Sequence, residues 1–328
     1  MAHLENGVWV DAPVARIKDG AFDRPASVFR NWVTPDGAPG PSGEGGFAPE
    51  SGRYHLYVSH ACPWAHRTMI VRELKGLSPH ISVSVVSPDM LGDGWTFSTD
   101  FPGATGDTLM GLPFLRDVYL AADPQASTKV TVPVLWDKER RTIVSNESSE
   151  IIRMMTSAWD AVTGNDLDLW PEDLREGIEP VNARIYDTVN NGVYRAGFAT
   201  SQGAYDRAVR DLFDTLDWLE ERLSRQRFLM GPRMTEADIR LFTTLVRFDT
   251  VYHGHFKCNR RKLMEYPNLW GFTRDLFQTP GVAGTVHLDH IARHYYYSHD
   301  RINPTRIVPI GPDLDLMAPH GREGLGAV

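Results

Sequence analysis

The sequence Cys62-Pro63-Trp64-Ala65 lies between a short run of β-forming residues, 54–59, and a segment with apolar residues at helical spacing, 63–74. Proline suits the first position of a helix because its missing N–H would have no partner within the helix there. The pattern predicts that Cys62 is the N-cap residue of this helix. A second β-branched run, 81–86, predicts a buried strand that pairs in parallel with the first through a right-handed crossover.

The following patterns extend this β-α-β unit. A loop-like stretch of about 40 residues precedes the run 132–136, which with 142–144 predicts a hairpin, and a helix is expected from 145 to 155. This order of elements is that of a thioredoxin-like domain. After about residue 165, strand patterns become rare. Amphipathic helical patterns occur instead at 174–189, 205–223, 235–248 and 282–296. The expected fold class is α/β plus all-α, a thioredoxin-like domain followed by a helical bundle.

These patterns divide the chain of 328 residues into four expected parts. An irregular extension rich in Gly and Pro covers 1–52, and the thioredoxin-like domain covers 53–160. An all-helical domain covers 161–297, and an extended tail covers 298–328. In the helical part, Thr235 and Asp238 have the spacing of a capping box at a helix start.

Composition restricts the partners and the compartment. The formal net charge is -8, with 34 basic and 42 acidic side chains, so the chain has no electrostatic attraction for nucleic acid or an anionic membrane. No apolar run predicts a membrane span or a signal segment. Two cysteines are too few for a disulfide framework and suit a reducing compartment. We therefore expect a soluble, cytoplasmic protein without nucleic-acid or membrane partners.

Cys62 is the candidate nucleophile. At a helix N-terminus, the free N–H groups and the helix dipole stabilise a thiolate and lower the pKa of the thiol. Ala65 occupies the position of the second cysteine of a dithiol redox protein, so an external thiol, most simply glutathione, must resolve a mixed disulfide. The alternative is a buried, inert cysteine. The neighbouring His60, His66 and Arg67 are expected to be solvated.

Two further segments could hold glutathione. Val132-Pro133 lies where the third strand of a thioredoxin-like domain begins, and the backbone N–H and C=O of Val132 could bind the peptide-like ligand. We predict a cis peptide bond there; a trans bond is the alternative. Glu147 and Ser148 start the next helix, where N–H groups and a hydroxyl could bind the glutamyl carboxylate of glutathione and Glu147 could pair with its ammonium. Simple helix capping is the alternative there.

Taken together, the motifs are similar to those of the glutathionyl-hydroquinone reductases, the Xi class of glutathione transferases. The resemblance covers roughly residues 50 to 312. The shared motifs are Cys62-Pro63-Trp64-Ala65-His66-Arg67, Gly94-Trp95-Thr96-Phe97, 130–137, Asn146-Glu147-Ser148, 192–199, Arg247-Phe248-Asp249 with Tyr252, 254–259, and His294-Tyr295-Tyr296 with Asn303-Pro304.

The resemblance implies a homodimeric enzyme that removes glutathione from a glutathionyl-hydroquinone. Cys62 attacks the thioether and forms a mixed disulfide with glutathione, and a second glutathione then releases oxidised glutathione. The implied glutathione contacts are Trp95, Lys129, Val130, Glu147 and Ser148, with Val130 in place of Val132 as the backbone contact. The implied hydroquinone pocket consists of Tyr194, Tyr252 and Tyr295, with Tyr194 also catalytic. A one-residue slip would exchange Tyr295 for Tyr296.

Several other interpretations remain open from the sequence. His287, His290 and His294 share a helix face at i, i+3, i+7 spacing, and His253 and His255 lie upstream. A metal site is therefore conceivable, although we expect none. Cys258 is expected to be structural. A transferase that conjugates glutathione to electrophiles, or a binding protein that keeps the fold without catalysis, would share most of these patterns.

Overall fold

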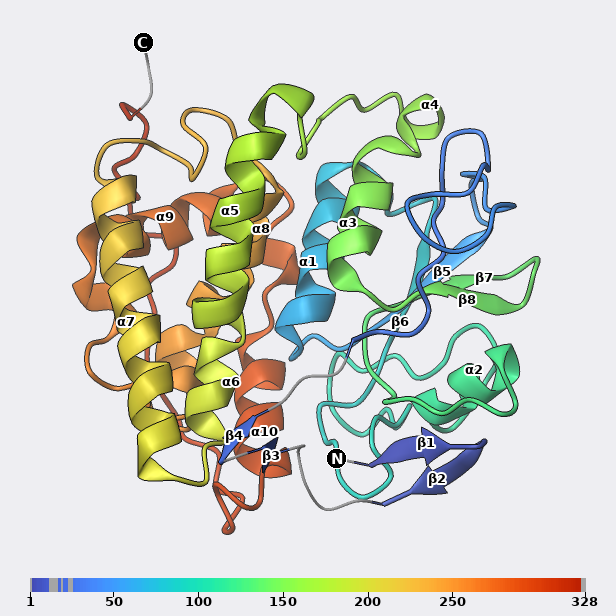
Figure 1. The fold of residues 1–328 in the computed structure, drawn as a ribbon, viewed down its shortest axis with the longest axis horizontal. Helices are drawn as coiled ribbons and strands as arrows, with labels where there is room; N and C mark the ends of the chain where they lie inside the picture. Colours follow the sequence, from blue (N-terminus) through green and yellow to red (C-terminus); the bar gives the residue numbers. More distant parts are fainter. Residues whose placement is uncertain (1, 12–16, 19, 23–25, 326–328) are drawn as a thin grey trace. The chain divides into compact units, whose positions relative to one another are not determined.

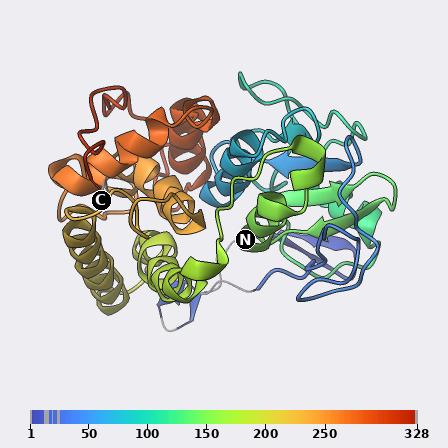
Figure 2. The ribbon, with the colours of Figure 1, turned by 90° about the horizontal axis from the view of Figure 1, so that it is seen from above.

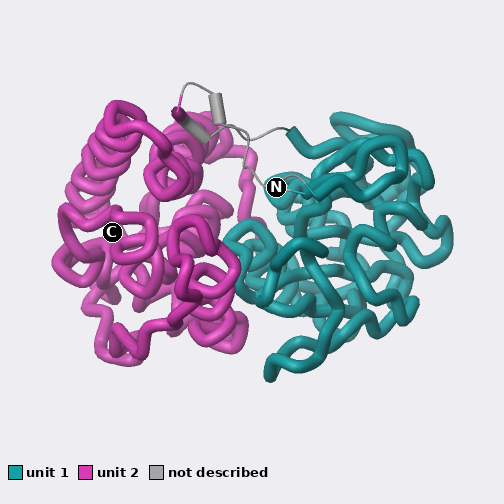
Figure 3. The backbone as a smooth tube through the Cα atoms, turned by 90° about the horizontal axis from the view of Figure 1, so that it is seen from below, with its two compact units in different colours: residues 1–14, 25–167 teal, residues 15–24, 168–328 magenta. Residues whose placement is uncertain are grey.

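The computed structural model describes residues 2–11, 17–18, 20–22 and 26–325. The chain divides into two compact units (Figure 3). Unit 1 comprises residues 1–14 and 25–167, and unit 2 comprises residues 15–24 and 168–328. No helix in the described part of the chain has both the length and the apolar character needed to cross a bilayer.

Unit 1 is built on a four-stranded sheet in the order β6-β5-β7-β8. β5 and β6 are parallel, as predicted, with His55 opposite Ser82, whereas β5–β7 and β7–β8 are antiparallel. All five residues of β5 are buried, as expected for an inner strand. The elements of this unit are β1 (His3–Glu5), β2 (Val8–Val10), β5 (Tyr54–Val58), α1 (Pro63–Leu74), β6 (Ser82–Val85), α2 (Leu115–Ala122), β7 (Val134–Asp137), β8 (Thr142–Ser145), α3 (Ser148–Ser157) and α4 (Asp160–Thr163).

The helices of unit 1 cover both faces of the sheet. α1 and α3 lie side by side on one face, and α2 lies on the other (Figure 1). The sequence predicted a loop between β6 and β7, so α2 is a correction to that prediction. The side chains of Leu115, Val118 and Tyr119 are buried at i, i+3, i+4 spacing. That spacing spans only eight residues, which is too short to stand out from the surrounding Gly and Pro.

The ends of unit 1 also differ from the expected boundaries. Residues 1–52 contain two short antiparallel hairpins, β1–β2 and, in unit 2, β3–β4 (Ile17–Lys18 and Ala21–Phe22). At the other end, unit 1 extends to Leu167. The fully buried Lys75 ammonium explains this, because it donates to Asp160 Oδ1 at 2.8 Å and to the carbonyl groups of Asn165 and Leu167.

His55 provides a test of how burial inside the sheet couples stability to pH. Its Nδ1 and Nε2 share hydrogen bonds with Ser82 Oγ at 2.7 Å and Ser84 Oγ at 2.9 Å. Burial lowers the pKa of His55 to about 4. Between pH 6.5 and 4 the unfolded chain therefore binds the proton and the folded chain does not, so acidification destabilises the folded state.

We expect His55→Gln to remove this part of the pH dependence. From pH 6.5 down to 4, the free energy of unfolding of the unmodified protein should fall more steeply than that of the variant, by about 1 kcal/mol per pH unit. Urea unfolding at closely spaced pH values measures both slopes. Above pH 7.5 the difference between the two proteins should be constant. Parallel curves from pH 4 to 8 would contradict the expectation.

Unit 2 is helical. Its long helix α7 packs against α6 and α9 (Figures 1 and 2). After the β3–β4 hairpin, its elements are η1 (Glu172–Leu174), α5 (Arg175–Ile185), the π-helical η2 (Tyr186–Asn190), α6 (Gly192–Gly197), α7 (Gln202–Leu223), α8 (Glu236–Arg247), the π-helical η3 (Phe248–Tyr252), η4 (Leu263–Glu265), α9 (Pro267–Gln278), η5 (Ala283–Thr285) and α10 (Leu288–Ser298).

Polar contacts inside unit 2 fix two helix ends. The predicted capping box of α8 is confirmed: Thr235 N donates to Asp238 Oδ2 at 2.8 Å, and the Thr235 side chain accepts from the Asp238 backbone N–H. After α10 the chain has no helix or strand up to residue 325, yet the Arg322 side chain is buried. Its guanidinium donates to the carbonyl groups of Leu223 and Gln226 at the end of α7, and so attaches the tail to the bundle.

Candidate functional site

Cys62 lies where the sequence predicted, at the N-cap of α1. Its thiol is half-buried and lies 3.6 Å from the carbonyl oxygen of Val132. The predicted cis Val132–Pro133 peptide bond is confirmed. The sulfur therefore adjoins a main-chain turn just before β7 and the first turn of a helix, and a helix N-terminus favours negative charge on an adjacent group.

Two of the three basic residues near Cys62 are not solvated, which corrects the expectation from sequence. His66 and Arg67 are only 2% and 1% exposed, whereas His60 is half-buried. The Arg67 guanidinium lies 4.4 Å from the Trp64 ring and donates to Ser148 Oγ at 3.4 Å. Residues at the start of a helix are usually exposed, but here α3 packs against α1 and its first residue, Ser148, contacts Arg67. Arg67 thereby joins the cysteine helix to Ser148.

The five residues expected to contact glutathione all belong to unit 1. Glu147 is the N-cap of α3, and the buried Ser148 is its first residue. Lys129 and Val130 are half-buried in the segment that leads to the cis proline, and Trp95 is 7% exposed in the segment before α2. The structure joins Ser148 to α1 through Arg67.

The Glu147 carboxylate caps its own helix, which is the alternative that the sequence left open. Its Oε1 accepts from the N–H of Ser149 at 3.2 Å and from the Ser149 hydroxyl at 2.8 Å. Its Oε2 accepts from the Ser27 hydroxyl at 3.1 Å. Capping does not exclude ligand binding, because an ionised carboxylate offers about four acceptor positions in all. A negative charge at this position also suits the positive end of the α3 dipole.

A second cluster, in unit 2, consists of the three tyrosines expected in the hydroquinone pocket. The Tyr295 hydroxyl lies 2.5 Å from that of Tyr194 and 2.9 Å from that of Tyr252, so the three phenols form one hydrogen-bonded chain. Tyr252 and Tyr295 are fully buried, and burial raises the pKa of each well above 10. Tyr194, at the end of the chain, is half-buried.

Geometry separates Tyr295 from Tyr296. The Tyr296 hydroxyl lies 3.5 Å from the carbonyl oxygen of Thr250, and its ring packs 4.8 Å from that of His255. Successive residues of a helix point about 100° apart, so only one of the pair can join the phenol chain.

The tyrosines are bordered by aromatic residues to which the sequence assigned no role. Phe256 stacks on Tyr252 with ring centres 5.6 Å apart, and the His299 ring lies 5.8 Å from Phe256. Burial lowers the pKa of His255 to about 4 and that of His299 well below 6.5, so both imidazoles are neutral at pH 7. The resulting cluster is aromatic, and Arg247 is the charged residue that acts electrostatically on Tyr252 and Tyr295. The sequence signal was the run of aromatic side chains at 252–256, which is interrupted only by Gly254.

A glycine of α6 makes this packing possible. A Cβ atom at Gly197 would lie 2.2 Å from the Phe256 ring, which is closer than any real contact. Gly197 therefore lets the Phe256 ring lie directly on the backbone of α6, the helix that carries Tyr194.

The remaining candidate residues have other surroundings. The described residues contain no group of three or more His, Cys, Asp or Glu side chains arranged to hold a metal ion, and the rings of His287 and His290 pack edge to face at 5.8 Å. Cys258 is fully buried, its thiol donates to the Phe256 carbonyl at 3.8 Å, and burial raises its pKa. Such a thiol is a poor nucleophile for exchange.

Comparison with known proteins gives consistent matches over the whole chain. Residues 61–158 match the family model of the glutathione S-transferase N-terminal domain, and residues 202–275 match that of the C-terminal domain. Glutathionyl-hydroquinone reductase YqjG of Escherichia coli is 59% identical over 98% of this chain and 99% of the relative. Glutathionyl-hydroquinone reductase PcpF of Sphingobium chlorophenolicum is 50% identical over 96% and 98%.

Solved structures agree with these matches. The glutathione-bound structure of YqjG aligns with a TM-score of 0.92 at 57% identity, over 98% of this chain and 99% of that one. An Xi-class glutathione transferase from Natrialba magadii aligns with a TM-score of 0.91 at 50% identity, over 99% and 98%. A thioredoxin-like unit with a cysteine at its first helix, followed by a helical unit, is the fold of a glutathione transferase. Within that fold, the chain belongs to the glutathionyl-hydroquinone reductases, the Xi class.

Proposed function

We propose that this protein is a glutathione-dependent enzyme that removes glutathione from glutathionyl-hydroquinones, with Cys62 as its nucleophile. The observation that carries the proposal is the half-buried Cys62 thiol at the start of α1, beside the cis Val132–Pro133 turn. Ala65, one turn later, supplies no second thiol. A lone thiolate of this kind exchanges with an external thiol. The relatives YqjG and PcpF bear the name of this activity.

The first step transfers the glutathionyl sulfur. The Cys62 thiolate attacks the thioether sulfur of the substrate, a Cys62–glutathione disulfide forms, and the bond between sulfur and the ring carbon breaks. The electron pair of that bond goes to the ring carbon, which takes a proton and leaves as the hydroquinone. The ring carbon is thereby reduced, and the two sulfurs are oxidised to a disulfide.

The second step regenerates the enzyme. The thiolate of a second glutathione attacks the glutathionyl sulfur of the mixed disulfide, which yields oxidised glutathione and the Cys62 thiolate. Glutathione is thus a co-substrate, and the two steps need no metal. We propose that Trp95, Lys129, Val130, Glu147 and Ser148 hold the glutathione. Because the γ-glutamyl end carries both a carboxylate and an ammonium, the start of α3 with Glu147 offers a partner to each.

Three tyrosines have proposed roles toward the hydroquinone. Tyr194, Tyr252 and Tyr295 receive the flat ring, and the Tyr194 hydroxyl supplies the proton to the ring carbon. The phenol chain supports this assignment, because hydrogen bonds from Tyr252 through Tyr295 stabilise the charge that develops on Tyr194 when it donates.

We also propose a thioredoxin-like glutathione-binding domain followed by a helical substrate domain, a homodimeric assembly and a cytoplasmic location. The presence of only two cysteines, of which Cys258 is fully buried, supports the reducing compartment. The names of the relatives support the quinone class of substrate.

Intact-protein mass spectrometry tests the function directly. The protein is mixed with one equivalent of a glutathionyl-hydroquinone and no free glutathione, and the released hydroquinone is quantified in the same sample. We expect one added glutathione per chain, located on Cys62 by peptide mapping, and one hydroquinone released. Adding glutathione should remove the adduct and produce oxidised glutathione. Hydroquinone release with no adduct at Cys62 would refute the proposal.

The phenol chain yields a prediction with a matched control. Tyr295→Phe removes the central hydroxyl and both of its hydrogen bonds, so we expect turnover to fall by about tenfold or more. Tyr296→Phe, in the adjacent position, should change turnover by less than about twofold, since its hydroxyl contacts main-chain groups of Thr250 and His255 and does not belong to the phenol chain. Steady-state rates across pH 6 to 9 measure both. Equal rates for the two variants would contradict the role of the chain.

A further inference from the structure

We propose that Ser27 is a positioning residue of the glutathione site. Its hydroxyl holds the Glu147 carboxylate in the orientation that receives the ammonium group of the γ-glutamyl end. This inference rests on the proposed function for the identity of the ligand. Ser27 lies outside residues 61–158, which match the family model of the N-terminal domain, so the general glutathione transferase fold does not supply this contact.

The two oxygens of Glu147 have different partners. Oε2 accepts from the Ser27 hydroxyl at 3.1 Å, whereas Oε1 accepts from the N–H and the hydroxyl of Ser149. The terminal torsion of a glutamate is broad, so a carboxylate held through one oxygen can still rotate. Donors at both oxygens fix its plane. The Ser27 hydroxyl also lies 3.3 Å from the Asn146 carbonyl, a longer alternative acceptor.

The segment that carries Ser27 is firmly attached to β8 and to the residue after it. Asn146 N donates to the Phe29 carbonyl at 3.1 Å, and Phe29 N donates to Asn146 Oδ1 at 3.2 Å. Asn31 N donates to the Val144 carbonyl at 2.9 Å, and Arg30 forms a bridge with Ser145. Residues 29–31 therefore extend the sheet beyond β8. The position of Ser27 is set by this pairing.

Two carboxylates, those of Glu147 and Glu150, interact electrostatically with Arg30 in this region. Arg30 binds Glu150 in a two-pronged ion pair, with Nε donating to Oε2 at 2.6 Å and Nη2 to Oε1. The donors that reach Glu147 from Ser27 and Ser149 are neutral hydroxyl and amide groups. They orient the Glu147 carboxylate and carry no charge themselves. An ammonium held by this carboxylate would gain a charge-assisted hydrogen bond.

The test compares two ligands and two variants by isothermal titration. The ligands are S-methylglutathione, which has no reactive thiol, and its analogue with hydrogen in place of the γ-glutamyl amino group. Ser27→Ala removes the contact. The control, Ser42→Ala, lies in the same segment, where the Ser42 hydroxyl donates to the Arg30 carbonyl at 2.6 Å and accepts from the Trp32 indole.

We expect the unmodified protein to prefer the ligand that carries the amino group. Ser27→Ala should reduce this preference by about three- to tenfold, with the affinity for the deaminated analogue unchanged. Ser42→Ala should keep the full preference. An unchanged preference in Ser27→Ala, or an equal loss of affinity for both ligands, would overturn the inference. Because no chemical step is involved, a protein that binds in this way yet fails to release hydroquinone would refute the proposed function alone.

Discussion

Replacement of Cys62 by serine is expected to lower hydroquinone release by about 10³-fold or more, because no other group can accept the glutathionyl sulfur. A serine hydroxyl is far less acidic than a thiol and does not form the mixed disulfide. Folding should be preserved, since serine is among the most favourable N-cap residues. We expect the free energy of unfolding to stay within about 1 kcal/mol of the original value. Product release by chromatography and urea unfolding measure the two effects.

The second cysteine is the matched control. Cys258→Ala removes a fully buried thiol, so it should cost stability through the cavity that it leaves. Its turnover at a temperature where it is folded should equal that of the unmodified protein. If Cys62→Ser retained turnover while Cys258→Ala lost it, the nucleophile would be misassigned. If Cys62→Ser instead gained the ability to join glutathione to electrophiles, the active site would be that of a conjugating transferase.

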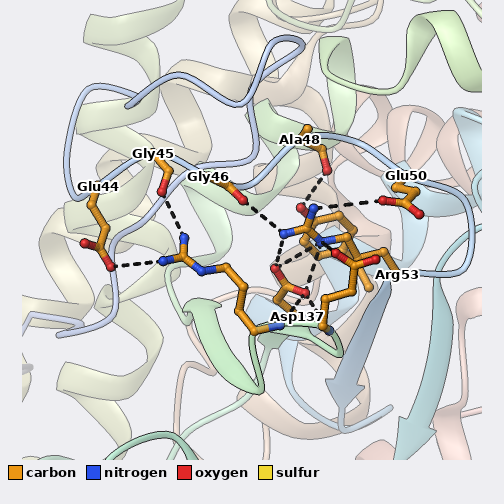
Figure 4. A network of polar contacts seen from close by, with 10 residues as sticks. Glu44, Gly45, Gly46, Ala48, Glu50, Arg53 and Asp137 are labelled. Carbon is orange, nitrogen blue, oxygen red and sulfur yellow. Dashed lines mark hydrogen bonds and ion pairs between the residues drawn. The ribbon is translucent and has the colours of Figure 1, made fainter.

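The largest expected loss of stability arises in unit 1, at the ion pair between Arg53 and Asp137. Arg53 directly precedes β5, and Asp137 is the last residue of β7, which pairs with β5. Their side chains are 9% and 0% exposed (Figure 4). The Arg53 guanidinium donates to Asp137 Oδ2 from Nη2 at 2.6 Å and from Nε at 3.1 Å. The same carboxylate accepts from the backbone N–H of Glu139 at 2.9 Å, in the turn between β7 and β8.

Asp137→Asn should destabilise the protein by about 3–5 kcal/mol, because it removes the one buried carboxylate that these contacts give Arg53 and leaves the exposed Glu50 and Glu139 as its partners. The amide nitrogen of asparagine would also face an N–H donor, which adds an unsatisfied contact. The control is Glu139→Gln, which removes an exposed partner of the same arginine at 3.4 Å and should cost less than about 1 kcal/mol. Urea unfolding at pH 7 compares the two. Similar losses in both variants would show that burial does not govern this pair.

The sequence predicted the part of the site that depends on local structure. The N-cap position of Cys62 followed from a strand pattern, a proline and a helix pattern that are adjacent in the chain. The cis peptide bond before Pro133 was likewise predicted from its place at a strand start, and the structure agrees. The α8 capping box was recognisable because both partners lie within four residues. Each of these features is fixed by a few neighbouring residues.

Other features depend on tertiary packing and could not be obtained this way. Arg67 looked like a solvated flanking residue, but the packing of α3 on α1 encloses it. The hydroxyl of Ser27 meets Glu147 across 120 residues of chain, and no pattern near Ser27 signals the contact. The π-helical turn that ends at Tyr252 shifts the register of the following side chains, which a strict helical period does not anticipate. Features of this kind can be recognised only in the three-dimensional structure.

The pairing of residues 29–31 with β8 also has a consequence for self-association. β8 is the last strand in the order β6-β5-β7-β8, and an uncovered last strand offers a row of N–H and C=O groups to any extended chain that it meets. Asn31 N already donates to the Val144 carbonyl on that side. Residues 29–31 thus cover an edge at which the sheets of identical molecules could otherwise pair into fibrous aggregates. This covering protects the folded protein in a crowded solution.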